Sequence, residues 1–156
     1  MSAQRLLAVL LASLCAALSA WAQMTPVGTW QSVGDETGQP KAQIVISEHD
    51  GALTGRIEKL LREGADPNEV CDRCTDDRKG QRLIGMEIIR GGKKAQDGDP
   101  EHPVWQGGRI LDPEKGSTYA LRLTPVDGGQ KLEVRGSIGP FGRTQTWLRV
   151  RPEPAR

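Results

Sequence analysis

Short runs of alternating apolar and polar residues, separated by turn signals, recur along most of this 156-residue chain. In such a run every second side chain points the same way, so one face of a strand is buried and the other is wet. Asp50-Gly51, between two of the runs, is a strong signal for a tight hairpin turn. The pattern predicts an all-β chain whose neighbouring strands are antiparallel. The eight expected strands cover residues 28–33, 41–47, 52–61, 85–90, 104–111, 117–124, 130–138 and 143–150.

Eight antiparallel strands without covering helices must bury their apolar faces against one another. They can do this by closing into a barrel or by folding into a two-sheet sandwich. Residues 61–83 fit the pattern less well, because they form a long connection without a clear strand, and such loops are uncommon in compact domains. Residues 57–63 are also compatible with a helical turn, and we expect the Cys-x-x-Cys motif in the connection to staple it.

Residues 1–22 have the three parts of a secretory signal. Arg5 supplies a positive charge, residues 6–18 are apolar, and residues 20–22 have the small-x-small pattern that signal peptidase cleaves. The apolar run is shorter than the about 20 residues that a membrane-spanning helix needs. We therefore expect cleavage after Ala22 rather than an anchor. Cys15 lies within the apolar run and not after it, so it does not fit a lipid-attachment site.

Removal of this leader leaves residues 23–156 as one domain, which we expect to be periplasmic or secreted in a Gram-negative bacterium. The whole chain has 21 basic and 20 acidic residues. Because the leader holds only Arg5, the two signs balance in the mature part. A balanced charge argues against a nucleic-acid partner. No other stretch is apolar enough to span a membrane.

The Cys71-Asp72-Arg73-Cys74 motif allows three interpretations. A thiol–disulfide exchange motif normally lies at a helix start in a βαβ fold. A zinc site needs four ligands, and only two histidines remain to complete one, both far away in the sequence. A structural disulfide between Cys71 and Cys74 fits best, because an exported compartment is oxidising. Closing so short a ring contributes about 2 kcal/mol.

The sequence carries none of the motifs that mark catalysis, phosphate binding or a bound metal. It lacks G-x-S-x-G, a phosphate-binding glycine loop and H-E-x-x-H, and the acidic residues beside the Cys motif lack the spacing of a calcium loop. Its two histidines, His49 and His102, lie in expected loops. We therefore expect a non-enzymatic protein without a cofactor or metal. If the chain were an enzyme, Asp112 and Glu114 would be the obvious carboxylates to test.

The first and last expected strands carry a pair that would meet where a barrel closes. A guanidinium such as that of Arg149 over the indole of Trp30 contributes about 0.5–2 kcal/mol. The alternative is that Trp30 is ordinary core and Arg149 an ordinary surface charge. We interpret residues 143–150 as the closing strand rather than a binding site. Its apolar face would hold Thr146, Leu148 and Val150, and its other face Arg143, Gln145, Trp147 and Arg149.

Several short motifs together carry a family resemblance that covers nearly the whole mature chain in order. They are residues 27–30 (VGTW), 35–38 (DETG), 71–74 (CDRC) with 77–79 (DRK), 85–86 (GM), 107–113 (GGRILDP), 134–136 (VRG) and 142–147 (GRTQTW). The chain resembles the bacterial exported domain-of-unknown-function family 2147. It departs from the family at residues 81–83, where a proline is usual, and in the longer segment 93–103. The resemblance implies a lipocalin-like, eight-stranded antiparallel up-and-down barrel and implies no reaction.

Two functional hypotheses follow from such a barrel. The first is that it binds a small apolar ligand, such as a fatty acid, in an interior just wide enough for one molecule. The second is a non-catalytic envelope module with a filled barrel, which would bind a protein or serve structurally through the Cys-bearing loop and residues 93–102. The state of the interior separates them. The residues expected to line a ligand site are Trp30, Ile44, Ile46, Leu53, Ile57, Tyr119, Leu121, Leu123, Leu132 and Val134.

Overall fold

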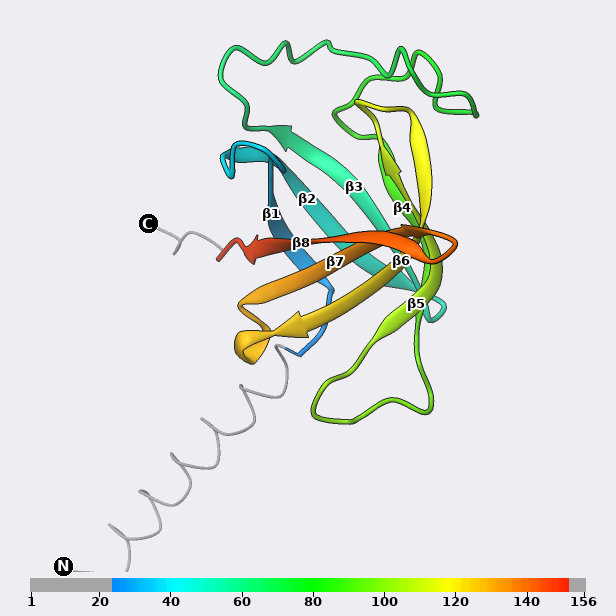
Figure 1. Ribbon diagram of the computed structural model, residues 1–156. Helices are drawn as coiled ribbons and strands as arrows, with labels where there is room; N and C mark the ends of the chain where they lie inside the picture. Colours follow the sequence, from blue (N-terminus) through cyan, green and yellow to red (C-terminus); the bar gives the residue numbers. More distant parts are fainter. Residues whose placement is uncertain (1–23, 152–156) are drawn as a thin grey trace, which may run out of the picture.

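The computed structural model describes residues 24–151, so the leader predicted over residues 1–22 lies outside the described residues. Eight strands in chain order and one short 3-10 turn make up the regular structure (Figure 1). No helix within the described residues is long and apolar enough to cross a membrane. The strands are β1 (Gly28–Val33), β2 (Pro40–His49), β3 (Ala52–Leu60), β4 (Glu87–Lys94), β5 (Trp105–Asp112), β6 (Ser117–Val126), β7 (Lys131–Ile138) and β8 (Phe141–Arg149), and the turn η1 covers Asp127–Gly129.

Every strand pairs antiparallel with the next, and the last pairs with the first. The closing contact pairs Trp30 of β1 with Arg149 of β8, and Gln31 with Leu148. The result is a closed eight-stranded up-and-down barrel, as the family resemblance implied, and not the two-sheet sandwich that the strand pattern also allowed. Closure leaves no unpaired sheet edge, so every strand finds backbone partners on both sides.

Alternating burial within the strands follows the alternation in the sequence. In β6, Leu121, Leu123 and Pro125 are buried, whereas Ala120 before them and Arg122 between them are exposed. The inward side chains of all eight strands form one core. The period-two pattern was therefore a correct guide to which face of each strand is buried.

The β2–β3 hairpin closes through Asp50-Gly51, as predicted. His49 pairs with Ala52, and the two turn residues have φ values of +50° and +74°. Both values are those of a two-residue hairpin turn whose twist matches that of the strands. His49 is exposed, as expected, but it is the last residue of β2 and not part of a loop.

Apart from shifts of one or two residues at strand ends, two expectations were wrong. Gly91-Gly92 does not end the fourth strand, which continues to Lys94, because Gly91 adopts φ of +86° and the register shifts opposite it, between Leu53 and Thr54. A glycine in this conformation absorbs an extra residue as a bulge without ending the pairing. The helical turn considered for residues 57–63 is also absent from the described structure, because β3 stays paired with β2 up to Leu60.

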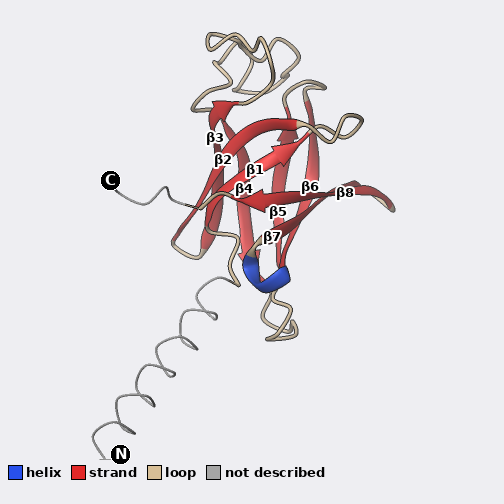
Figure 2. Ribbon diagram, turned by 90° about the vertical axis from the view of Figure 1, so that its left-hand side faces the viewer, coloured by secondary structure: helices blue, strands red, loops and turns tan. Residues whose placement is uncertain are grey.

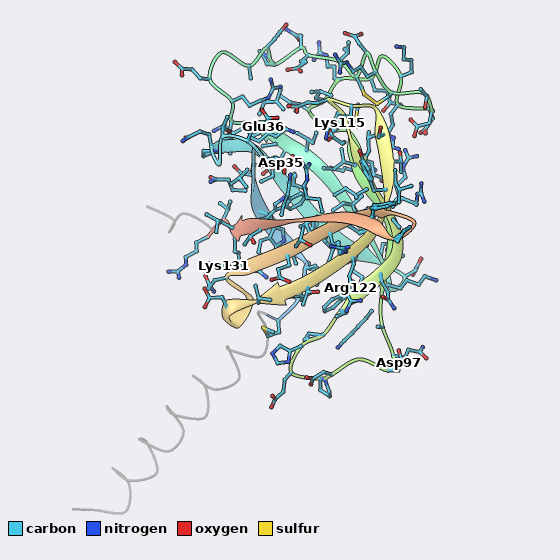
Figure 3. The ribbon with its side chains drawn as sticks, in the orientation of Figure 1. Asp35, Glu36, Asp97, Lys115, Arg122 and Lys131 are labelled. Atoms are coloured by element: carbon cyan, nitrogen blue, oxygen red, sulfur yellow. A yellow bond between two sulfur atoms is a disulfide. The ribbon has the colours of Figure 1, made fainter. Side chains whose placement is uncertain are left out.

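The barrel has two unlike ends. The open end carries the β1–β2 turn, the long loop of residues 61–86 (hereafter the disulfide loop) and the β5–β6 turn (Figures 1 and 2). The closed end carries the β2–β3 turn, the β4–β5 loop and η1. In Figure 3, Asp35, Glu36 and Lys115 lie at the open end, and Lys131 and Asp97 lie toward the closed end.

Candidate functional site

The closed half of the barrel is filled with large side chains. Trp30 lies across its base, and its indole Nε1 donates to the carbonyl oxygen of Pro26 at 2.7 Å. Because large buried side chains fill this half, it is a packed core with no room for a ligand. The large buried side chains of this half are Trp30, Ile46, Leu53, Trp105, Leu121, Leu123 and Leu132.

Arg149 seals the closed end from outside. Its guanidinium carbon lies 4.1 Å from the centre of the Trp30 ring, so the predicted pair meets at the closure. The same guanidinium donates to the carbonyl oxygens of Thr25 at 2.7 Å, Val27 at 3.0 Å and Gly129 at 2.6 Å. Burial lowers the pKa of Arg149. One side chain thus ties the segment before β1, η1 and the last strand into a lid over the indole.

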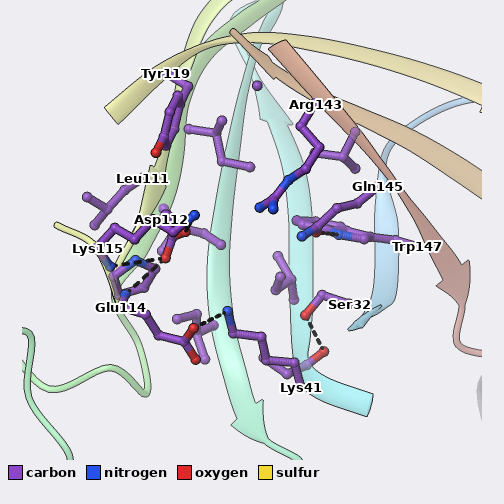
Figure 4. A pocket seen from close by; sticks show the side chains of 18 of the residues that line it. Ser32, Lys41, Leu111, Asp112, Glu114, Lys115, Tyr119, Arg143, Gln145 and Trp147 are labelled. Atoms are coloured by element: carbon purple, nitrogen blue, oxygen red, sulfur yellow. Dashed lines mark hydrogen bonds and ion pairs between the residues drawn. The ribbon is translucent and has the colours of Figure 1, made fainter. Parts of the chain in front are cut away.

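The open half contains a cavity of about 450 Å³. This volume is within the range of small-molecule sites, which are about 300–1,000 Å³. Its inner wall is apolar, and charged groups gather toward the rim (Figure 4). The apolar lining includes Ala42, Ile44, Ile57, Leu60, Leu83, Ile88, Ile110, Leu111, Val134 and Trp147, and the polar or charged lining includes Ser32, Lys41, Arg62, Asp112, Glu114, Lys115, Tyr119, Arg143 and Gln145.

Ion pairs hold the rim on the β2 and β5–β6 side. Lys41 Nζ lies 2.9 Å from the Glu114 carboxylate, as the dashed line in Figure 4 shows, and Lys115 Nζ lies 4.0 Å from that of Asp112. The Asp112 carboxylate also accepts the backbone N–H groups of Glu114 and Lys115 at 3.0 and 3.3 Å. The two carboxylates considered for catalysis therefore stabilise a turn and its cations.

The opposite wall comes from β8 and is braced by the β1–β2 turn. The Asp35 carboxylate accepts hydrogen bonds from Arg143 and Gln145. The Gln145 side-chain oxygen accepts the indole N–H of Trp147 at 2.9 Å. All three β8 side chains point into the cavity, opposite Leu111 and Tyr119 (Figure 4). Asp35 therefore orients the polar groups of this wall from outside the barrel.

The disulfide loop supplies Leu83 to the cavity and covers the β5–β6 turn. Cys71 and Cys74 form the predicted disulfide, with their Cα atoms 5.5 Å apart. The contact with the turn is close enough to require glycine, because a Cβ on Gly116, whose φ is +70°, would collide with the backbone of Arg73. The stapled ring thus rests directly on the turn that carries the rim carboxylates.

A charged network fastens the disulfide loop to the outer side of β4. The buried Arg78 donates to the Glu87 carbonyl oxygen at 2.9 Å and to the Asp76 carboxylate at 3.1 Å. The hydrogen bond from Arg78 lowers the pKa of Asp76 to about 2. Arg90 binds the Asp77 carboxylate at 3.0 and 2.9 Å and so lowers the pKa of Asp77. These contacts fix the loop as part of the cavity wall.

The ten residues expected to line a ligand site divide between the two halves. Ile44, Ile57, Tyr119 and Val134 line the cavity. The other six lie in the described core away from the cavity lining: Trp30, Ile46, Leu53, Leu121, Leu123 and Leu132.

Sequence reasoning missed the β8 wall and the disulfide-loop wall. The β8 segment closes the barrel, as interpreted, but its inward face is the one with Arg143, Gln145 and the buried Trp147. The supposed apolar face points out, since Leu148 is exposed. The sequence feature that could have indicated this inward face is Trp147, which follows Arg143 and Gln145 at every second position.

Within the described residues, no group of three His, Cys, Asp or Glu side chains could hold a metal ion.

A family model matches this barrel from end to end. It covers residues 28–149 and is described as an uncharacterized protein conserved in bacteria, domain of unknown function 2147. The chain belongs to this bacterial family. The matched range runs from the first residue of β1 to the last residue of β8, so the family's conserved unit is the whole barrel.

Among solved structures, the barrel is similar to protein HP1028 from the human pathogen Helicobacter pylori, described as belonging to the lipocalin family. The TM-score is 0.68 at 18% sequence identity, over 82% of this chain and 84% of that chain. At this identity the likeness shows a shared lipocalin fold. No curated protein matches the chain significantly.

Proposed function

We propose that this protein binds one small apolar molecule, such as a fatty acid, in the open half of its barrel. The observation that carries the proposal is the cavity of about 450 Å³ with an apolar wall and a polar rim. Such a combination gives a ligand both burial and orientation. The lipocalin fold supports the proposal, and a completely filled barrel would not contain this space.

The rim suggests how an amphiphile would lie. Its chain would occupy the space between Ile44, Ile57 and Val134, and its carboxylate would stay near Lys41 and Arg143. Both cations are already paired with carboxylates of the protein. An acidic head group would therefore exchange one charge-assisted contact for another.

The first experiment is titration with a fluorescent fatty-acid analogue. Val134→Phe places a ring in the cavity, and Leu148→Phe adds the same ring on the outer side of β8. We expect saturable binding by the natural protein, a loss of about tenfold or more in affinity for Val134→Phe, and no change for Leu148→Phe. Absence of saturable binding, or equal binding by Val134→Phe, would overturn the proposal.

A second titration tests the head group. Lys41→Gln should weaken a fatty acid by about fivefold more than the fatty alcohol of the same length, because only the acid carries a charge. Lys59→Gln, an exposed lysine on β3 that does not line the cavity, is the control. An equal effect of Lys41→Gln on both ligands would mean that the site binds an apolar ligand and does not recognise an acidic head group.

We also propose that the protein is exported, remains in the periplasm or outside the cell, and acts without catalysis. The support is the secretory pattern of residues 1–22 and a disulfide suited to an oxidising compartment. Native mass spectrometry of protein made with its own leader would report cleavage after Ala22. The same spectrum would reveal a co-purified ligand as an added mass that disappears on denaturation.

A further inference from the structure

Two large apolar side chains project from the tip of the β7–β8 hairpin. Ile138 is 61% exposed and Phe141 is 81% exposed, and the two residues pair directly across the hairpin. The large hydrophobic side chains exposed in the described residues are these two, Ile84 and Leu148. Ile84 lies in the disulfide loop, which, like the β7–β8 hairpin, connects strands at the open end.

The tip continues the inner face of the barrel beyond its rim. Val134, Gly136 and Ile138 alternate on one face of β7, and all three line the cavity, as Phe141 does from β8. On β7 the inner face therefore leads from the cavity wall to the exposed tip, with Gly136 between Val134 and Ile138. A chain-like molecule leaving the cavity along this face would meet Val134 inside and Ile138 and Phe141 at the tip.

The turn makes the tip rigid. The hairpin reverses through Gly139, whose φ is +55°, and Pro140, whose ring fixes its own φ. A rigid apolar tip loses little conformational entropy on docking, which favours binding to a surface.

The four strands β5 to β8 carry more basic than acidic residues. In β5 to β8 the acidic residues are Asp112 and Glu133. Arg122 and Arg135 stand directly opposite each other on the outer faces of β6 and β7, and Arg122 is labelled on the barrel surface in Figure 3. Like charges in direct opposition are unfavourable by themselves, so this pair suits an anionic partner. The basic residues of these strands are Arg109, Arg122, Lys131, Arg135, Arg143 and Arg149. Lys131 and Arg149 lie at the closed end and Arg143 is paired with Asp35, so Arg122 and Arg135 are the two that the docking uses.

We propose that the hairpin tip docks on an anionic phospholipid bilayer. Ile138 and Phe141 enter the boundary between head groups and acyl chains, and Arg122 and Arg135 stay among the phosphates. In this position the mouth of the cavity faces the acyl chains. An apolar ligand then passes between bilayer and cavity without crossing water. Docking goes beyond ligand binding and needs no bound ligand.

The test is cosedimentation with vesicles of phosphatidylcholine alone or mixed with phosphatidylglycerol. We expect binding to the mixed vesicles that weakens as salt rises. The double variant Ile138→Ser with Phe141→Ser should lose about tenfold or more in partitioning, because it removes the inserted side chains. Leu148→Ser, which removes a large exposed side chain outside the tip, should stay within about twofold.

A second set of variants tests the contribution of Arg122 and Arg135 to vesicle binding. Arg122→Gln with Arg135→Gln should reduce binding to the mixed vesicles and flatten the salt dependence. Lys93→Gln with Lys131→Gln, at the closed end, should do neither. Circular dichroism before sedimentation establishes that each variant is folded.

Four results would overturn the proposal, and the last of them is the loss of vesicle binding in Val134→Phe. The first is no binding of the natural protein to either vesicle, and the second is an equal loss for Leu148→Ser. The third is a dimer in size-exclusion chromatography that the tip variant abolishes while vesicles bind neither protein, which would assign the tip to a second copy. Val134→Phe separates docking from ligand uptake: vesicle binding that persists in this variant supports docking, and binding that disappears would mean lipid extraction into the cavity.

Discussion

The two halves of the barrel interior are built by the same eight strands, yet one is filled and the other is hollow. The difference lies in side-chain size along each strand. On the inner face of β7, Leu132 fills the closed half, whereas Val134 and Gly136 line the cavity. On the first two strands, Trp30 is core and Ala42 lines the cavity. Alternation therefore marks the inner face, and on these strands the volume of the inward residue separates core from cavity, whereas on β8 the large Trp147 lines the cavity.

The largest contrast is expected from the two buried indoles. Trp30→Ala removes a side chain packed on all sides, and we expect a loss of about 3–5 kcal/mol in the free energy of unfolding. Trp147→Ala removes one whose face already borders the cavity, and we expect about 1–2 kcal/mol. Urea unfolding measures both. Equal losses would mean that the closed half is no better packed than the open half.

The second comparison enlarges a side chain in each half instead of truncating one. Leu132→Phe overpacks the filled half and should reduce the free energy of unfolding by about 1–3 kcal/mol. Val134→Phe, two positions along the same strand face, has the cavity to expand into and should change it by less than about 1 kcal/mol. Thermal unfolding at matched concentration compares them. A larger loss for Val134→Phe would show that the cavity does not accept the ring.

The disulfide acts on the open half alone. Replacing Cys71 and Cys74 by serine should reduce the free energy of unfolding by up to about 2 kcal/mol, because the unfolded chain is no longer constrained. Hydrogen exchange should accelerate in residues 61–86 and stay unchanged around Trp30. Faster exchange in both halves would contradict their independence.

The smallest effect concerns pH. The pKa of Asp76 lies near 2, below its value in an unfolded chain, so its stabilisation is complete above about pH 4 and disappears as pH falls toward 2. Because more than a third of its side chain is exposed, solvent limits the effect to below about 1 kcal/mol. Asp76→Asn should lack this part of the acid dependence in urea unfolding between pH 5 and 2. An unchanged profile would locate the acid sensitivity elsewhere.

Local patterns predicted the strands, the Asp50-Gly51 hairpin and the disulfide because each depends on neighbouring residues. The pairing of Trp30 with Arg149 could be predicted because the first and last strands must meet in a closed barrel. The bulge at Gly91 was not readable, since it depends on the register of the partner strand. Nor was the cavity, whose walls join the disulfide loop to β8 across most of the chain. The predicted leader, residues 1–22, stays a prediction.

The closed barrel has an even number of up-and-down strands, so the chain enters and leaves it at the same end. β1 starts and β8 ends at the same pole, beside Arg149 and opposite the mouth (Figure 1). An attachment joined directly before residue 24 or after residue 151 therefore holds the protein by its sealed base. A fused reporter or a surface linker at these points would leave the cavity and the hairpin tip facing the solution.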